Sequence, residues 1–198
     1  MPIPKVAIIS SDRRNAETLI GEAPSEVEVV LIDRELSDEE KAPTLIDVVA
    51  IILHLSNISL ELLRRCPRVK LIQTLSAGTD RYDVKAINEM GIPVATNGGA
   101  NAIAVAEHTI ALMIGLCRRT MLQWDQAGRQ RKWREGLANI FLTELTGKTV
   151  GIVGMGLIGK QVAKRLMGFE TNTVYHNTTD LPDEVQRTLN ARPVAFEE

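Results

Sequence analysis

Gly154, Gly156 and Gly159 follow one another in the spacing Gly-x-Gly-x-x-Gly, between the apolar run 149–153 and the amphipathic stretch 157–167. This context predicts a tight turn between a buried strand and a helix. Gly154 would permit the turn, Gly156 would let a diphosphate approach the main chain, and Gly159 would let the helix pack close to the strand. The helix N-terminus would add unpaired N–H groups. The run therefore predicts a dinucleotide site, the alternative being an ordinary strand-to-helix turn rich in glycine.

Asn177 follows the expected strand 173–176, where we expect the ribose of a bound dinucleotide to lie. An acidic residue about 20 residues beyond the glycine run commonly accepts the ribose hydroxyls. A carboxylate there would repel the 2′-phosphate of NADP, whereas the neutral amide of asparagine would not. No arginine follows, because the next residues are Thr178 and Thr179. We therefore expect NAD or NADP as cofactor, with a relaxed or NADP-leaning preference.

The elements that position these residues alternate between strand and helix patterns, which predicts parallel pairing in a doubly wound sheet. In the first hundred residues we expect strands at 5–10, 27–32, 47–55, 69–75 and 92–95, and helices at 15–21, 59–65 and 83–91. A long helix capped by Asn101 should run to about residue 120. A polar connector over 123–135, with Trp124 and Trp133, should follow. The second strand–helix system starts at Lys148 and continues with strands at 173–176 and 193–196.

The composition fits a globular protein of one large or two small domains. The chain has 198 residues, 44% hydrophobic and 24% charged, with a net charge of −2. Basic runs and aromatic stacking platforms are missing, which argues against nucleic-acid and membrane-surface binding. No stretch reaches the roughly 20 apolar residues of a membrane span, and no targeting segment is visible. Cys66 and Cys117 have no metal-ligand spacing, so we expect free thiols and a cytoplasmic location.

Four segments in order carry a family resemblance: 74–80, 101–108, 145–159 and the helix and strand that follow. Together they resemble the D-isomer-specific 2-hydroxyacid dehydrogenases, a group that includes phosphoglycerate dehydrogenase, glyoxylate/hydroxypyruvate reductase and phosphite dehydrogenase. The resemblance implies an α/β protein with two domains. A flavodoxin-like, doubly wound domain over 1–100 would contact the substrate, and an incomplete Rossmann dinucleotide-binding domain over 101–198 would hold NAD or NADP.

The resemblance also implies roles for single residues. The backbone amides of Ala77 and Gly78 would hold the substrate carboxylate, the alternative being a plain strand-to-helix turn. Val105 would lie beside the nicotinamide, the alternative being core packing on a buried helix. Met155, Leu157 and Ile158 would complete the backbone loop around the pyrophosphate.

The family's catalytic arginine, histidine and carboxylate match no residue of this chain. Glu107 and His108 are adjacent on a helix and point about 100° apart, so we expect no catalytic pair there. We expect part of an oxidoreductase that transfers a hydride between NAD(P) and the 2-position of a small D-2-hydroxy or 2-keto acid. The chain by itself should be an inactive fragment without a metal site.

Two other functions stay open. One is a nucleotide-sensing binding module of the corepressor kind, and the other is a natural short form that acts as an assembly partner. The resemblance implies a homodimer formed through the long helix and the arm from Trp124 to Trp133. The alternative is that this helix packs only within the protein.

Overall fold

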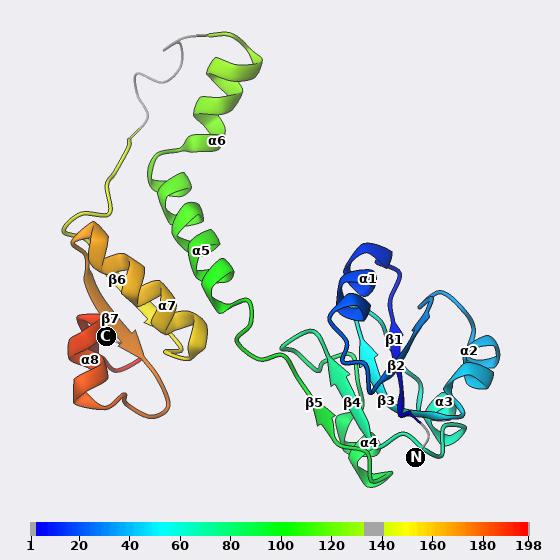
Figure 1. Cartoon of the computed structure of the whole chain (residues 1–198). Helices are drawn as coiled ribbons and strands as arrows, with labels where there is room; N and C mark the ends of the chain where they lie inside the picture. Colours follow the sequence, from blue (N-terminus) through cyan, green and yellow to red (C-terminus); the bar gives the residue numbers. More distant parts are fainter. Residues whose placement is uncertain (1–2, 133–140, 198) are drawn as a thin grey trace. The chain divides into compact units, whose positions relative to one another are not determined.

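The computed structural model of the chain describes residues 3–132 and 141–197. The chain divides into two compact units, residues 1–100 and residues 101–198. Each unit is built on its own parallel β-sheet and is described by itself (Figure 1).

The first unit is a five-stranded parallel sheet in the strand order β2-β1-β3-β4-β5. This is the strand order of flavodoxin-like folds, so the predicted doubly wound α/β fold is confirmed. Its elements are β1 (Lys5–Ile9), α1 (Arg13–Gly21), β2 (Glu28–Ile32), α2 (Asp38–Leu45), β3 (Val48–Leu53), α3 (Leu60–Arg64), β4 (Leu71–Thr74), α4 (Val84–Glu89) and β5 (Val94–Ala95).

The core of the first unit lies along the three middle strands. Ile9 on β1, Ile51 and Leu53 on β3, and Ile72 on β4 are at most 1% exposed. They belong to one cluster with Leu63 of α3. Parallel strands covered on both faces need nearly continuous apolar runs, which is why KVAII and VVAIIL read as buried strands from sequence alone.

Helix α2 was missing from the sequence prediction. Its start is fixed by a capping box in which the Ser37 Oγ accepts from the Glu40 N–H at 3.3 Å. In return the Glu40 carboxylate accepts from the Ser37 N–H at 2.8 Å. The Ser37 hydroxyl also donates to this carboxylate at 2.8 Å, and the two hydrogen bonds that the carboxylate accepts, the backbone one first, lower the pKa of the Glu40 carboxyl. The Ser-x-x-Glu spacing before the helix was the available signal, and Pro43 within the helix weakened the pattern.

The second unit is a three-stranded parallel sheet in the order β6-β7-β8. Read from the other edge this is the order 3-2-1 found in one half of a Rossmann fold. Its elements are α5 (Ala102–Cys117), α6 (Thr120–Gln123), the π-helical turn η1 (Trp124–Arg129), β6 (Thr149–Val153), α7 (Leu157–Leu166), the 3-10 turn η2 (Met167–Phe169), β7 (Asn172–His176), α8 (Asp183–Leu189) and β8 (Ala191–Pro193).

Three expectations about the second unit need correction. The long helix ends at Cys117, because Arg119 has left-handed backbone angles with φ of 51°. The side chain of Asn101 makes no capping hydrogen bond, although the residue stands at the cap position. The last strand is Ala191–Pro193 and not 193–196, and Phe196 lies beyond it with its ring against His176 at 5.3 Å between centroids. Trp133, part of the predicted arm, lies outside the described residues.

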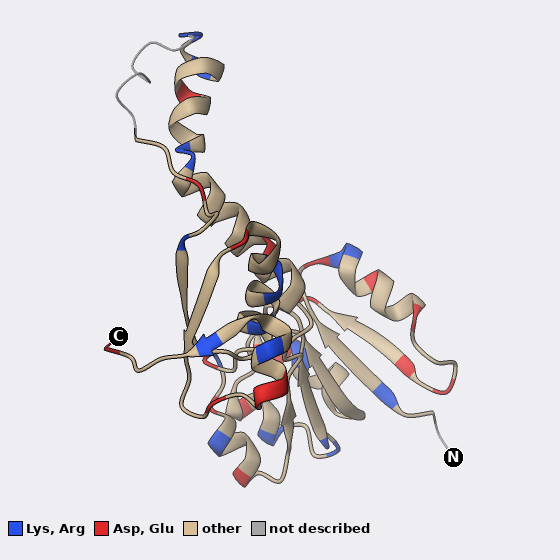
Figure 2. Ribbon diagram, turned by 90° about the vertical axis from the view of Figure 1, so that its left-hand side faces the viewer, with Lys and Arg blue, Asp and Glu red and all other residues tan. Residues whose placement is uncertain are grey.

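Helix α5 packs on α7 through small and branched apolar side chains. Ala106 and Ile110 form a buried cluster with Val162 and Leu166 of α7. Glu107 is the one Asp, Glu, Lys or Arg of α5, which is tan along most of its length in Figure 2. No helix in the described part of the chain is long and apolar enough to cross a membrane.

Candidate functional site

The glycine run forms the turn between β6 and α7. Gly154 has φ of +94°, a conformation that side chains rarely adopt. A Cβ on Gly159 would collide with the carbonyl oxygen of Gly154, so helix and turn can approach only because Gly159 has no side chain. A Cβ on Gly156 would meet nothing within 4 Å. The fold itself therefore requires glycine at 154 and 159, whereas the space over Gly156 is open.

The N-terminus of α7 has the properties of an anion site. No side chain caps the helix, and its first turn contains no acidic residue. The first N–H groups of a helix have no partner within it and carry the positive end of the dipole. Leu157 and Ile158 are 61% and 41% exposed, so their backbone lies at the surface. These N–H groups and the open space over Gly156 fit a diphosphate, which would be held by main-chain groups alone.

Asn177 lies against the glycine loop. The Met155 N–H donates to the Asn177 Oδ1 at 3.3 Å, and the Asn177 Nδ2 donates to the Thr179 carbonyl at 2.8 Å. The structure therefore brings together two residues that the sequence analysis named separately. The side chain of Met155 is 2% exposed and packs in the core with Tyr175. Met155 contributes its amide to Asn177 and its side chain to packing.

A cavity of about 490 Å³ opens at the carboxyl ends of β7 and β8. It is lined by His176, Asn177, Thr178, Asp180, Pro193, Val194 and Ala195. Ligands of open α/β sheets bind at this end. Asp180, an exposed carboxylate three residues after Asn177, was not predicted, because it lies beyond the positions directly after the strand where a ribose-binding residue was expected. A second cavity, of about 720 Å³, lies at the amino ends of the same strands beside Thr149 and Asn172.

Ala77 and Gly78 lie in an exposed turn directly after β4, in the first unit. The Thr74 hydroxyl donates to the Ser76 carbonyl at 2.8 Å, and the Ser76 hydroxyl donates to the Gly78 carbonyl at 2.9 Å. Within the described residues, no hydrogen bond uses the N–H group of Ala77 or Gly78. Hydroxyl groups of Thr74 and Ser76 thus bind two carbonyl groups of the turn, and the N–H groups of Ala77 and Gly78 stay available. Such a pattern of free backbone amides suits an anion.

Two residues of helix α5 that the sequence analysis considered, Val105 and Glu107, have different surroundings. Val105 is half-buried and accepts the Thr109 hydroxyl on its carbonyl at 2.8 Å. Glu107 pairs with Arg165 of α7 at 2.8 Å, so Glu107 is engaged across the helix–helix contact and not with its neighbour His108. The ion pair fastens α7, the helix that follows the glycine loop, to α5.

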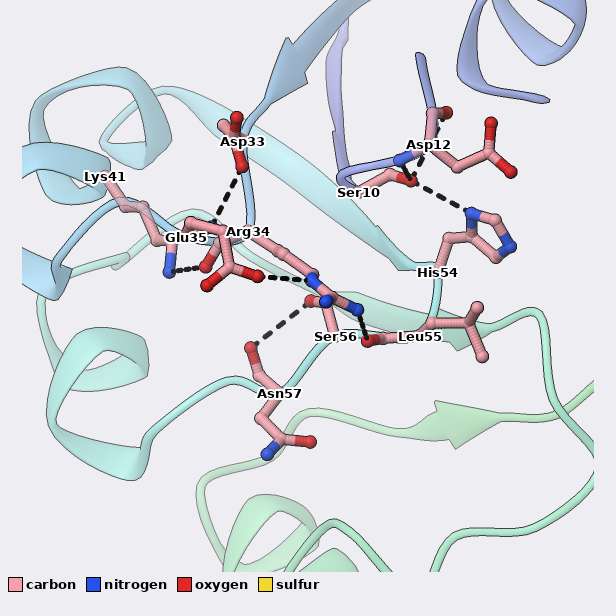
Figure 3. A network of polar contacts seen from close by, with 10 residues as sticks. All are labelled: Ser10, Asp12, Asp33, Arg34, Glu35, Lys41, His54, Leu55, Ser56 and Asn57. Atoms are coloured by element: carbon pink, nitrogen blue, oxygen red, sulfur yellow. Dashed lines mark hydrogen bonds and ion pairs between the residues drawn. The ribbon is translucent and has the colours of Figure 1, made fainter. Parts of the chain in front are cut away.

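His54 has a partner that sequence reasoning missed. Its Nδ1 lies 2.9 Å from the Ser10 hydroxyl, which also accepts the Asp12 N–H at 2.9 Å (Figure 3). The two residues stand at the carboxyl ends of β1 and β3, 44 positions apart in the chain. Only the pairing of these two strands brings them together.

The two thiols and the acidic side chains form no metal centre in the described part of the chain. Cys66 is buried and Cys117 half-buried, and both are free, as expected. Burial raises the pKa of the Cys66 thiol. Among residues 3–132 and 141–197, no three His, Cys, Asp or Glu side chains gather in a way that could hold a metal ion.

Comparison with known proteins shows the family of this chain. Residues 6–192 match the D-isomer specific 2-hydroxyacid dehydrogenase family, in its catalytic domain. The chain belongs to this family. A glyoxylate reductase of Pyrococcus furiosus is 32% identical over 201 residues, which cover 98% of this chain and 59% of that protein. The chain therefore spans about three fifths of the length of this relative.

Solved structures of the family have the same fold. A glyoxylate reductase from Paecilomyes thermophila superposes with a TM-score of 0.76 at 29% identity, covering 100% of this chain and 62% of that one. A D-lactate dehydrogenase from Aquifex aeolicus, complexed with NAD and lactic acid, has a TM-score of 0.75 at 22% identity. The match covers 96% of this chain and 56% of that protein, and at this identity it supports the fold alone.

Proposed function

We propose that this chain carries the cofactor loop and the substrate-carboxylate loop of an oxidoreductase. The enzyme would transfer a hydride between NAD(P) and the 2-position of a small D-2-hydroxy or 2-keto acid. The observation that carries the proposal is the uncapped N-terminus of α7 under the open space at Gly156. Family membership supports the same reaction class.

Each part of the chain has a distinct task in this proposal. A bound nicotinamide dinucleotide would supply the hydride acceptor or donor. The N–H groups at the start of α7 would bind its diphosphate, and Asn177 would lie beside its ribose, in the domain over 101–198. Val105 would contact the nicotinamide. The amides of Ala77 and Gly78, in the domain over 1–100, would bind the substrate carboxylate.

The direct test is calorimetric titration of the folded chain with NAD and with NADP. Saturable binding of either dinucleotide supports the proposal. A folded chain that binds neither would overturn it, because the loop would then be an ordinary glycine-rich turn.

The cofactor preference depends on Asn177 in this proposal. We expect Asn177→Asp to weaken NADP binding by about tenfold or more and to retain NAD, because the new carboxylate would repel the 2′-phosphate. Aspartate has the shape of asparagine and can still accept the Met155 N–H. Comparison of the two dissociation constants by calorimetry checks this.

Asn172→Asp is the matched control for Asn177→Asp. It is the same substitution at the exposed amino end of the same strand, and it should leave the NAD-to-NADP ratio unchanged. An unchanged ratio in Asn177→Asp would assign the preference to other residues.

The chain alone is expected to bind cofactor without turnover. His54 faces Ser10 and His176 faces the Val194 carbonyl, and in the described part of the chain no histidine has a hydrogen bond or ion pair with a carboxylate. A histidine without a carboxylate partner lacks the group that would orient it as general acid. Mixing the chain with reduced cofactor and glyoxylate, hydroxypyruvate or pyruvate should leave the absorbance of the reduced cofactor constant. Steady oxidation that follows protein concentration would contradict this.

A second copy of the chain is the proposed partner of the apolar surface on α5 and α6. Leu112, Leu116 and Met121 are 55%, 70% and 76% exposed there. Leu112 and Leu116 are four residues apart and so share one face of α5, and exposed apolar surface of this kind marks interaction sites. Sedimentation velocity should show a dimer, and Leu116→Asp with Met121→Asp should give the monomer. Leu36→Asp, an exposed leucine of the first unit, is the control that should remain dimeric.

A further inference from the structure

The first unit contains a cavity of about 450 Å³ that the proposed reaction does not use. It opens where β2 ends, α2 begins and the chain leaves β3. Figure 3 shows Arg34, Lys41, Ser56 and Asn57 gathered around this place, apart from the pair of Ser10 and His54. Arg81, which follows the turn after β4, also lines the cavity.

Lys41 is the unusual residue of this cavity. It is only 7% exposed, and its ammonium group donates to the Arg34 carbonyl at 2.7 Å. Within the described residues no carboxylate oxygen lies within 4.0 Å of it. The charge of Lys41 acts on the Glu40 carboxyl only from beyond ion-pair distance. A buried charge is costly unless it is closely paired, and an ammonium group has three N–H donors, of which this contact uses one. Helix α2 therefore places the buried Lys41 ammonium at the cavity wall, and two of its three N–H donors are not used by this hydrogen bond.

Two arginine side chains, Arg34 and Arg81, also line the cavity. Arg34 donates to the Leu55 carbonyl at 2.9 Å and pairs with Glu35 at 2.7 Å. Leu55 has left-handed backbone angles, with φ of 48°, and its carbonyl accepts the hydrogen bond from Arg34. The chain turns there, and Asn57, two residues later, lines the cavity. Arg81 has no ion pair among the residues that the structure describes.

The balance of charge around the cavity is positive. Three basic side chains, Arg34, Lys41 and Arg81, face two acidic ones, Glu35 and Asp38, which leaves a net charge of +1. Glu35 is neutralised by Arg34, and Asp38 accepts the Ser59 hydroxyl. Lys41 and Arg81 are thus the two cations of this cavity that form no ion pair within 4.0 Å among the described residues, and they come from different segments of the chain.

We propose that this cavity binds a phosphate group, either as inorganic phosphate or as the head of a small phosphate ester. Lys41, Arg81 and Asn57, which supply N–H donors, line it from three separate segments. Donors supplied by several separate segments suit the tetrahedral arrangement of phosphate oxygens, whereas a planar carboxylate suits one bidentate arginine. All the residues belong to the first unit, so the site depends neither on the glycine loop nor on the proposed reaction.

The test is an NMR titration of the ¹⁵N-labelled 198-residue chain with inorganic phosphate, at ionic strength held constant with chloride. We expect a saturable shift of the Asn57 side-chain amide. Lys41→Met, which keeps the length of the side chain and removes the charge, should weaken binding about tenfold to a hundredfold. Asp38→Asn should strengthen binding, because it removes a repelling carboxylate from the wall.

Lys85→Met is the matched control, since the Lys85 side chain is 89% exposed on α4 and lies outside the cavity. It should bind phosphate like the unchanged chain. If Lys41→Met does not fold, Arg81→Gln tests the same point with an exposed side chain. A parallel titration with glycerol 3-phosphate distinguishes the sources: tighter binding than inorganic phosphate identifies an ester, and equal or weaker binding identifies the free ion. The absence of a saturable Asn57 shift in both titrations, or equal binding by folded Lys41→Met, would overturn the proposal.

Discussion

Gly156→Ala is expected to weaken binding of NAD and NADP by about tenfold to a hundredfold while the protein stays as stable as before. A Cβ at this position meets no protein atom within 4 Å, so the fold has room for it. The backbone of Gly156 is extended, with φ of −79°, which alanine adopts without strain. The methyl group would instead occupy the space through which a diphosphate reaches the N–H groups of α7. Calorimetric titration measures the affinity.

Thermal unfolding decides whether the loss in Gly156→Ala is specific. The midpoint should stay within the shift that about 1 kcal/mol produces. Unchanged cofactor affinity in a folded Gly156→Ala variant would show that the diphosphate does not lie over this residue.

Gly159→Ala, the same chemical change three residues later, is expected to act on stability. Its Cβ would collide with the carbonyl oxygen of Gly154 and approach the Ile152 side chain at 3.3 Å. A backbone carbonyl cannot swing aside as a side chain can, so α7 would have to move off β6. We expect the second unit to lose at least about 2 kcal/mol of its free energy of unfolding.

Hydrogen exchange read by mass spectrometry can measure this loss unit by unit. In Gly159→Ala the amides of β6 and β7 should exchange faster, and those of β1 and β3 should keep their rates, because they belong to the other unit. Exchange in β6 as slow as in the unchanged chain would mean that the turn relaxes at little cost. The two alanine variants together separate the glycine needed for a ligand from the glycine needed for packing.

Local signals predicted most of the elements well. The apolar run of β3 and the Asp83 cap of α4 can be read within a window of a few residues, and both were found where expected. Helix α2 was not predicted, because its capping signal is not accompanied by a clear apolar stripe. The end of α5 was also predicted wrongly, because the residue with left-handed backbone angles, Arg119, is not a glycine and so gives no sequence signal for a helix end.

The candidate site was predicted in its parts and not in its contacts. The sequence placed Asn177 at the end of a strand, but its hydrogen bond to the Met155 amide depends on how β7 lies beside β6. In the same way Glu107 was recognised as no partner of His108, yet its actual partner, Arg165, is 58 residues away on α7. Such contacts depend on helix packing, which periodicity alone does not specify.

By itself the amino-acid sequence determined the alternation of strands and helices, the glycine turn and the family, because each of these is encoded in short segments that can be read one by one along the chain. Only the tertiary structure decided which distant side chains meet. The clearest case is Lys41, which in the sequence is one more charged residue after Asp38, Glu39 and Glu40 and is in fact buried beside a cavity. Burial and charge balance are properties of residues that the fold brings together from separate strands, so no local pattern contains them.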